Sequence, residues 1–235
     1  NATYGFATNA NNFIKPDDTV FAGGLYDAHG VLIASWDTLI NDYGMDISKN
    51  YTASTCISDP ANPAFILNST PALQQGVSLV INNFSKIGDY AFYNCSILTN
   101  VVVGPGIVEV GYAAFRKCQN LQVVSISSSV RKMHTSPFLY CPSLTYINVH
   151  EDNAVYTSTD GILYNKDMSI LYQYPLGNVR NVFYLPDSVM VLEEHSFAGA
   201  KYLKEFITNE TSNLTIKKQG VFDECENLTN IVLPE

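Results

Sequence analysis

A repeat of about 23 residues in the second half of the chain constrains the fold more than any other feature. Three segments align without gaps from Ile87, Val110 and Met133, and two further copies begin at Leu192 and Gln219. Phenylalanine recurs at intervals of 23, 23, 59 and 25 residues, and leucine recurs at the same intervals six positions later. Units of this size cannot bury their own apolar side chains, so the shared register predicts that they stack around one continuous core. The two columns are Phe92, Phe115, Phe138, Phe197 and Phe222, and Leu98, Leu121, Leu144, Leu203 and Leu228.

Within each repeat, the order Leu-x-x-apolar-x-apolar has the alternation of a β-strand. Val101 and Val103 should therefore point into the core, whereas Thr208 interrupts the same column in the fourth copy. We expect five such strands in one parallel sheet on one side of a coil. A second apolar pair precedes three of the phenylalanines and predicts a short return strand. These pairs are Ile107 with Val110, Val130 with Met133, and Val189 with Leu192.

The segment IGDYAFYNCSILTNVVV, which starts at Ile87, resembles the BspA-like leucine-rich repeats, whose unit carries Ile-Gly, Ala-Phe, Cys and Leu at these spacings. The string YLPDSVMVLEEHSF is similar to the Pro-Asp-Ser-Val turn and repeat start of the same family. The resemblance extends from about residue 77 to the C-terminus and departs from the pattern at His134, Ala200 and Thr208. It implies a β-dominated α/β leucine-rich-repeat solenoid, a right-handed coil with a parallel sheet and short helical turns.

The 59-residue interval exceeds two repeats of 23 by 13 residues, so it does not hold two plain repeats. Residues 150–183 alternate polar and apolar side chains around turn signals at Asp160-Gly161 and at Pro175 with Gly177. We predict β-hairpin strands that lie along the solenoid. The same segment resembles an insertion found in the BspA-like family.

Residues 1–76 show no period, and we expect an N-terminal α+β cap built from a hairpin and a helix, followed by the solenoid over 77–235. The hairpin turns at Ala28-His29-Gly30, and a helix follows Ser35. A second short helix is expected at Pro71–Gln75. The alternative is that residues 1–76 form a separate binding module. Because the sequence ends at Glu235 directly after a repeat strand, we expect further repeats or a cap to follow.

Charge and motifs exclude several classes of function. The formal net charge of −9 argues against nucleic acid and anionic membrane surfaces as partners, because both need a basic face. No run of 18 apolar residues occurs, so we expect no membrane span. The chain has no CxxC pair and no Gly-rich phosphate loop. We expect a protein that is not an enzyme and has no cofactor and no metal site.

The chain has five cysteines, and an odd number excludes complete intramolecular pairing. Cys95, Cys118 and Cys141 share one column, which Cys225 continues. The column allows a metal ladder or disulfides between turns, but parallel side chains have poor disulfide geometry. We favour a ladder of buried thiols. Cys56 lies outside the column and is expected to be the most reactive thiol.

Two pairs of side chains offer catalytic alternatives. His134 lies seven residues before Cys141, which suggests a Cys–His nucleophile pair, but both fill positions that other copies give to Gly or Cys. Glu193 and Glu194 are adjacent, so their side chains should diverge and suit acid–base catalysis poorly. Structural roles explain all four residues better.

The outward positions of the repeat strands mix apolar, aromatic and polar side chains, as protein interfaces do, although an ordinary β-surface has a similar composition. With the BspA-like resemblance, this predicts a secreted or cell-surface module, an adhesin or host-interaction protein that binds a host matrix or surface protein. The alternative is a glycan-binding module of the bacterial envelope. The candidate residues on the sheet are Asn100, Val102, Val123, Ser125, Tyr146, Asn148, Glu205, Ile207, Asn230 and Val232. The candidates in the insertion are Tyr156, Tyr164, Tyr172 and Tyr174, some of which we expect to pack on the solenoid instead.

Overall fold

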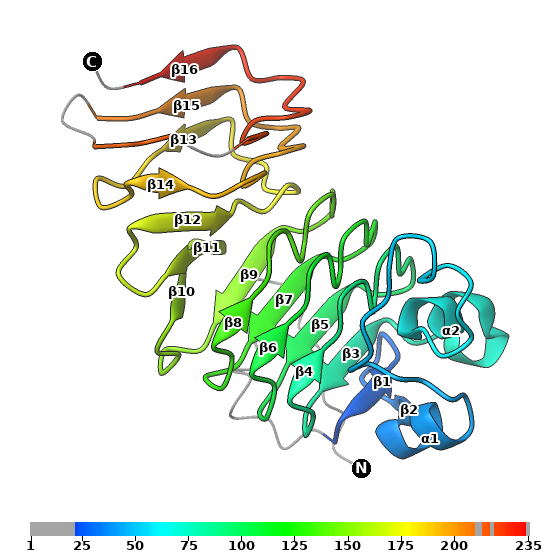
Figure 1. Cartoon of the computed structure of the whole chain (residues 1–235). Coiled ribbons are helices and arrows are strands. Elements are labelled where there is room, and N and C mark those ends of the chain that lie inside the picture. Colours follow the sequence, from blue (N-terminus) through cyan, green and yellow to red (C-terminus); the bar gives the residue numbers. More distant parts are fainter. Residues whose placement is uncertain (1–21, 210–212, 217–218, 234–235) are drawn as a thin grey trace.

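A computed structural model describes residues 22–209, 213–216 and 219–233 of the chain. The predicted stacked repeats are confirmed, and they form a coil whose strands lie side by side in two groups (Figure 1). The first stack consists of the parallel strands β3 (Ser78–Ile81), β5 (Asn100–Val103), β7 (Val123–Ile126) and β9 (Tyr146–Val149). The second stack consists of the parallel strands β13 (Val182–Tyr184), β15 (Glu205–Ile207) and β16 (Asn230–Val232).

The predicted return strands are also present. They are β4 (Lys86–Ile87), β6 (Glu109–Val110) and β8 (Lys132–Met133), which pair in parallel, and β14 (Val191–Leu192). Ile87, Val110 and Leu192 are buried on these strands, and Met133 is half-buried. Strands β4, β6 and β8 form the side of the coil opposite the first stack, whereas β14 pairs with strand β12 of the insertion (Figure 1).

The phenylalanine column is the centre of the core in the first stack. Phe92, Phe115 and Phe138 are buried, and their rings stack with centroids 5.0 Å and 5.8 Å apart. The spacing matches the distance between neighbouring strands, so each ring packs on the ring of the turn before it. The predicted register is therefore confirmed.

The predicted ladder of buried thiols is confirmed in the first stack. Cys95, Cys118 and Cys141 are buried and unpaired. Each thiol of the second and third turns donates to a phenylalanine carbonyl of the turn before, Cys118 Sγ to Phe92 O and Cys141 Sγ to Phe115 O, both at 3.1 Å. The same carbonyls also accept from the amides of Cys95 and Cys118, so each thiol adds a second donor that links one turn to the turn before it.

The N-terminal hairpin, β1 (Gly24–Tyr26) and β2 (Leu32–Ser35), forms as predicted and extends the first stack. Strand β1 pairs antiparallel with β3, so the hairpin covers that edge of the parallel sheet. Helix α1 (Trp36–Asn41) begins where predicted, with the side chain of Ser35 accepting a hydrogen bond from the amide of Thr38. Whether residues 1–76 fold as a separate unit stays a prediction, and residues 1–21 lie outside the described part of the chain.

The helix that the structure shows at residues 63–69 was not predicted. Helix α2 (Pro63–Ser69) begins at Asn62, whose side chain accepts from the amide of Phe65 at 2.9 Å. The predicted helix at residues 71–75 is instead a 3₁₀ turn, η1 (Pro71–Leu73). Thr70, the expected N-cap of that helix, makes no side-chain cap bond, and its backbone amide instead caps the end of α2.

The insertion forms an antiparallel sheet of β10 (Tyr156–Thr159), β11 (Ile162–Asn165) and β12 (Ile170–Gln173), as predicted for hairpin strands. Strand β12 then pairs in parallel with β14. The tip of the first hairpin closes the free edge of β9, because the amide of Ile147 donates to the carbonyl of Gly161 at 2.9 Å. The prediction of one sheet with five repeat strands is therefore wrong: the insertion pairs with β9 and separates it from β13.

The insertion also contains a repeat that the sequence reading missed. Tyr174, which lies 23 residues before Phe197 in the chain, is buried. Its ring stacks on that of Phe197, with the two centroids 4.9 Å apart. Strand β13 follows Tyr174 at the spacing by which β15 follows Phe197. The 59-residue interval thus holds one additional repeat and 13 extra residues. We call the region between strand β9 of the first stack and strand β13 of the second, which contains the insertion, the joint.

Candidate binding surfaces

The outward face of the first stack is less exposed than predicted. Val102 is only 6% exposed, because it packs with Val80 and Tyr26, a residue of the N-terminal hairpin. Ser125, a small side chain between Val102 and Asn148 on the neighbouring strands, is also buried. The expected exposure of Val102 and Ser125 is therefore wrong. Four predicted candidates on this face remain partly exposed: Asn100, Val123, Tyr146 and Asn148.

The second stack presents an open face. Tyr184, Ile207 and Val232 lie next to one another in register on β13, β15 and β16. Tyr184 is 70% exposed and Val232 is 42% exposed, while Ile207 is half-buried between them. Beside this apolar row lie two polar residues, Glu205 on β15 and Asn230 on β16, which are in register with each other. We call these five residues the second-stack face.

Tyr184 was not among the predicted candidates. Its strand belongs to the missed repeat, where Tyr174, Gly177 and Arg180 replace the usual Phe, Cys and Leu. The spacing of eight residues between Tyr174 and the start of β13 is the signal that could have found it.

Most predicted tyrosines of the insertion belong to the core. Tyr156, Tyr164 and Tyr174 are buried, so these three are the ones that pack on the solenoid and are not available as contacts. Tyr156 belongs to the core cluster of the first stack, whereas Tyr164 and Tyr174 belong to that of the second. The hydroxyl of Tyr156 accepts a hydrogen bond from the amide of Met133 at 2.8 Å, which ties the insertion to strand β8. Tyr172 remains half-buried and contacts the ring of Tyr156 edge-on, with centroids 5.5 Å apart.

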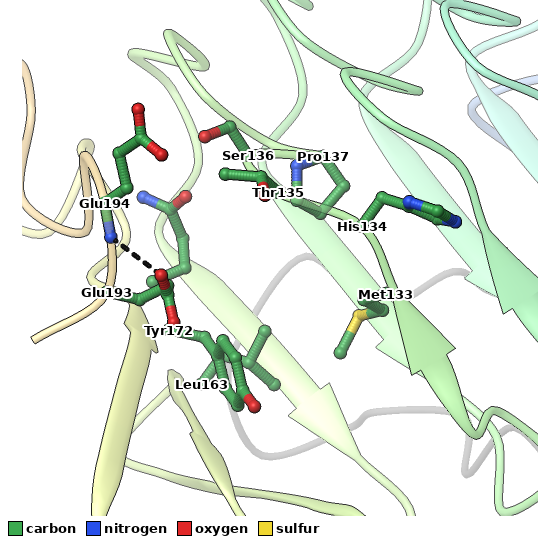
Figure 2. Close-up of a pocket in the computed structure, with 10 residues that line it drawn as sticks. Met133, His134, Thr135, Ser136, Pro137, Leu163, Tyr172, Glu193 and Glu194 are labelled. Atoms are coloured by element: carbon green, nitrogen blue, oxygen red, sulfur yellow. Dashed lines mark hydrogen bonds between the residues drawn. The ribbon is translucent and has the colours of Figure 1, made fainter. Parts of the chain in front are cut away.

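A cavity of about 230 Å³ lies at the joint on the side of the return strands. Figure 2 shows Glu193 and Glu194 on one side of this cavity and His134 on the other. Glu193 Oε1 accepts a hydrogen bond from the amide of Glu194 at 3.3 Å, so the first carboxylate is turned back on the chain. The remaining lining residues are Met133, Thr135, Ser136, Pro137, Leu163, Tyr172 and Gln173.

The contacts of His134 argue against a nucleophile pair. Its Nε2 lies 2.7 Å from Glu109 Oε1, whereas the thiol of Cys141 donates to a backbone carbonyl. The hydrogen bond with His134 lowers the pKa of Glu109, and the nearby Lys132 and Lys86 act in the same direction. Glu109 thus links three basic side chains of the return sheet, and His134 has a structural partner. The two glutamates and His134 do not form an arrangement that activates a nucleophile.

The expectation that Cys56 is the most reactive thiol is wrong. Cys56 is 1% exposed, and burial raises the pKa of its thiol. Cys225 is partly exposed, whereas the other four cysteines are buried. Its thiol still donates to the carbonyl of Phe197 at 3.1 Å, so it keeps the hydrogen bond of the ladder.

Within residues 22–209, 213–216 and 219–233, no group of three or more acidic, histidine or cysteine side chains is arranged to hold a metal ion. In the same ranges, the helices are too short and too polar for any of them to cross a bilayer.

Comparison with known proteins agrees with the architecture. The chain resembles the pneumococcal vaccine antigen PcpA with 24% identity and a TM-score of 0.52, over 67% of this chain and 50% of that one. It also resembles a leucine rich cell surface protein from Faecalibacterium prausnitzii, with 19% identity and a TM-score of 0.43, over 73% and 63% of the two chains. The chain thus spans about half the length of PcpA and less than two thirds of the second protein. Among curated proteins, none matches the sequence.

The repeats themselves identify the family. Six copies of the repeat described as the BspA type leucine rich repeat region match residues 75–175 and 172–235. These ranges cover more than half of the chain and include both stacks and the insertion. The chain therefore belongs to the BspA-type leucine-rich repeat family.

Proposed function

We propose that this chain is a secreted or cell-surface protein-binding module, an adhesin or host-interaction protein, that engages its partner through the second-stack face. The observation that carries the proposal is the row of Tyr184, Ile207 and Val232, three apolar side chains in register on neighbouring strands. Exposed aromatic and aliphatic side chains in a contiguous patch mark interaction surfaces of soluble proteins. Repeat proteins of this family typically act as non-catalytic binding modules.

The strands supply a rigid base for this row. The backbone groups of β15 pair on both sides, with β13 and β16, so the side chains and not the backbone are available to a partner. Tyr184 contributes a large contact area with few rotatable bonds, which is the property of binding hot spots. Glu205 and Asn230 give polar contacts beside the apolar row, as at the rim of an interface.

The partly exposed residues of the first stack are a second part of the proposed surface. Asn100, Val123 and Tyr146 lie in register along β5, β7 and β9, and Asn148 lies on the same face. Tyr146 is packed beside Gly161 of the insertion, which limits its exposure. These residues therefore contribute less contact area than the second-stack face.

The proposed location and partner draw on similarity as well. The Faecalibacterium protein is described as a cell surface protein, and PcpA is described as a vaccine antigen. An exposed location on or outside a bacterial cell agrees with a host matrix or surface protein as the partner. We propose no catalytic activity for the described surfaces.

A panel of immobilised extracellular-matrix and host-surface proteins tests the proposal by surface plasmon resonance. We expect one or more of them to bind, and Tyr184→Asp and Ile207→Asp each to weaken binding by at least about tenfold, since each buries a charge at the centre of the contact. The matched control is Met190→Asp, because Met190 is also exposed and apolar but precedes β14, away from this face. Binding that both face variants leave unchanged would place the contact elsewhere, and a panel without any binder would remove the protein-binding proposal.

The second candidate function is a glycan-binding module of the bacterial envelope. The observation that favours it is a shallow groove at the joint, lined by Tyr140 and Tyr202 together with amide and hydroxyl side chains. A glycan array with the wild-type chain tests this candidate independently of the protein panel.

A further inference from the structure

A groove at the joint gathers unpaired basic side chains. It consists of two adjoining depressions of about 510 Å³ and 260 Å³ that share Pro142. The first is lined by Arg116 and Lys117, and the second by Lys201. The groove lies across the junction of the stacks, because the lining comes from residues before β9 and from residues after the insertion.

The charge of this groove differs from that of the whole chain. The chain has 22 acidic and 13 basic residues, yet the groove has three basic residues and a single carboxylate, Glu224. Within the described residues, Arg116, Lys117 and Lys201 make no ion pair, whereas Lys49, Lys86, Lys132 and Arg180 each lie within 4.0 Å of a carboxylate. The groove is therefore a local positive site on an acidic molecule.

Aromatic rings hold the three cations in place. The guanidinium of Arg116 lies 5.1 Å from the ring centre of Tyr140, and the ammonium of Lys201 lies 4.8 Å from that of Tyr202. Lys117 lies 5.7 Å from the ring centre of Tyr93. A cation fixed over a ring loses less rotational freedom when it binds an anion, so the site is prearranged for a negatively charged ligand.

Arg116 gives the most specific indication. Its Nε is buried without an acceptor, and its guanidinium donates no hydrogen bond within the described residues. The outer edge of a guanidinium presents a fork of N–H donors that matches the two oxygens of a carboxylate or a sulfate. The side chain lines the groove, so an anionic group of a ligand there would accept from the Nη donors at the outer edge, while the buried Nε stays out of its reach.

The other lining residues favour a sugar over an acidic peptide. Gln119, Gln122 and Thr145 can donate and accept hydrogen bonds, as sugar hydroxyls do. Glu224 accepts hydrogen bonds and would repel a chain of closely spaced carboxylates, but it can accept from a hydroxyl. Tyr202, which is partly exposed, offers an apolar ring against which a sugar ring can pack.

We propose that this groove binds an acidic polysaccharide, with Arg116 and Lys201 engaging carboxylate or sulfate groups on its sugars. The inference rests on the second candidate function for its ligand class and does not depend on the second-stack face. Since the contacts are charged and solvent-accessible, binding weakens as salt increases.

The test measures binding of the whole chain to four probes by isothermal titration calorimetry at low salt. Polygalacturonate carries carboxylates, dextran sulfate carries sulfates, neutral dextran carries neither, and poly-glutamate represents an acidic peptide. We expect binding to one or both acidic polysaccharides, and a loss of at least about tenfold in R116Q and in K201Q. R116K should restore little, because an ammonium lacks the fork of donors.

The matched control is K132Q, which removes the same charge on the return sheet, where Lys132 lies 3.7 Å from Glu109. It should change affinity by less than about twofold, and Tyr184→Asp should also leave it unchanged. Thermal unfolding of each variant confirms that the fold is retained, and K201Q, at an exposed position, keeps the test valid if R116Q is destabilised.

Several results would overturn the inference. Equal binding of poly-glutamate would assign the groove to acidic peptides, and unchanged binding in R116Q and K201Q would move the site elsewhere. If neutral glycans bind on the array and acidic ones do not, the second candidate function holds, but the proposal of an acidic ligand is wrong. If no glycan of either kind binds, both fail, and the protein-binding proposal is judged on its own panel.

Discussion

The first and second stacks follow the same repeat but differ in regularity and exposure. In the first stack the rings of Phe92 and Phe115 are nearly parallel, with an interplanar angle of 2°, whereas Phe197 and Phe222 are tilted by 36°. The outward face of the first stack is partly covered by Tyr26, while Tyr184 on the second is open. The comparison teaches that the repeat pattern determines which side chains are buried in the core. Elements outside the repeats, such as the N-terminal hairpin, determine which turns remain exposed to a partner.

The largest expected contrast concerns the ring column. Phe115→Ala should lower the free energy of unfolding by about 3–5 kcal/mol, because the ring is buried between two others. Phe222→Ala should cost about 1–2 kcal/mol, because that ring is only half-buried. Chemical denaturation of both variants measures the difference. Equal costs, or a cost below about 1 kcal/mol for Phe115→Ala, would show that the two stacks are not distinguished by packing.

The thiol column provides the second contrast. Cys118 is buried and Cys225 is partly exposed, so a thiol reagent should alkylate Cys225 about 100-fold faster, equivalent to ~3 kcal/mol of local opening. Burial raises the pKa of Cys225 and raises that of the fully buried Cys118 further, so exposure and ionisation both favour labelling of Cys225. Mass spectrometry of peptides after timed labelling gives the rates, and unfolded protein supplies the reference rates. Comparable native rates at the two cysteines would mean that the first stack opens as readily as the second.

The contact between the insertion and strand β9 can be weakened by one substitution at the tip of the hairpin. Gly161 has a φ of +80°, and a Cβ there would lie 2.6 Å from the ring of Tyr146, so Gly161→Ala should cost about 2 kcal/mol. The control is Gly44→Ala, because Gly44 has a similar φ of +71° but open space around it. The difference in thermal stability between the two variants isolates the contact at the joint. No difference would indicate that the hairpin tip does not pack on β9 in solution.

The smallest expected effect is electrostatic and belongs to the first stack. The hydrogen bond with His134 lowers the pKa of Glu109 below its ordinary value of 4.5, so its contribution is present above that pH and is lost as pH falls through the lowered pKa. Glu109→Gln should therefore reduce stability by less than about 1 kcal/mol above pH 4.5 and by almost nothing at about pH 2.5. The equivalent strand of the second stack, β14, pairs Val191 with Ile170 and should show no such dependence. Denaturation at both pH values checks this, and a pH-independent cost would exclude the ion pair as its cause.

The core was predictable from the sequence because burial in a solenoid repeats with the chain. Phe115, Cys118 and Leu121 each lie in a column whose other members are equally buried in the first stack. Thr208 interrupts such a column yet is buried, because its hydroxyl donates to the carbonyl of Val232 at 2.9 Å. A single sequence shows the break in the column but not the carbonyl that accommodates it.

The candidate surface was less predictable because exposure depends on segments distant in the chain. Val102 looked like any other outward residue, but Tyr26 of the hairpin lies against it. Tyr184 was overlooked because Tyr174 stands where other repeats have phenylalanine, and an aromatic hydroxyl in the core breaks the expected pattern. Helix α2 was missed because its start signal, Asn62 followed by Pro63, lies in the part of the sequence that has no repeat. No aligned copy there supports the assignment of a helix.

The ladder of thiols also determines how the molecule withstands oxidants. Peroxides attack ionised sulfur, and burial both excludes the reagent and raises the pKa of Cys95 and Cys118, so these sulfurs stay reduced while the first stack is closed. At Cys225 the sulfur is partly accessible, and a sulfenic acid there would disturb its hydrogen bond to Phe197. Among the cysteines, chemical ageing should thus begin at Cys225 and leave Cys95 and Cys118 unmodified.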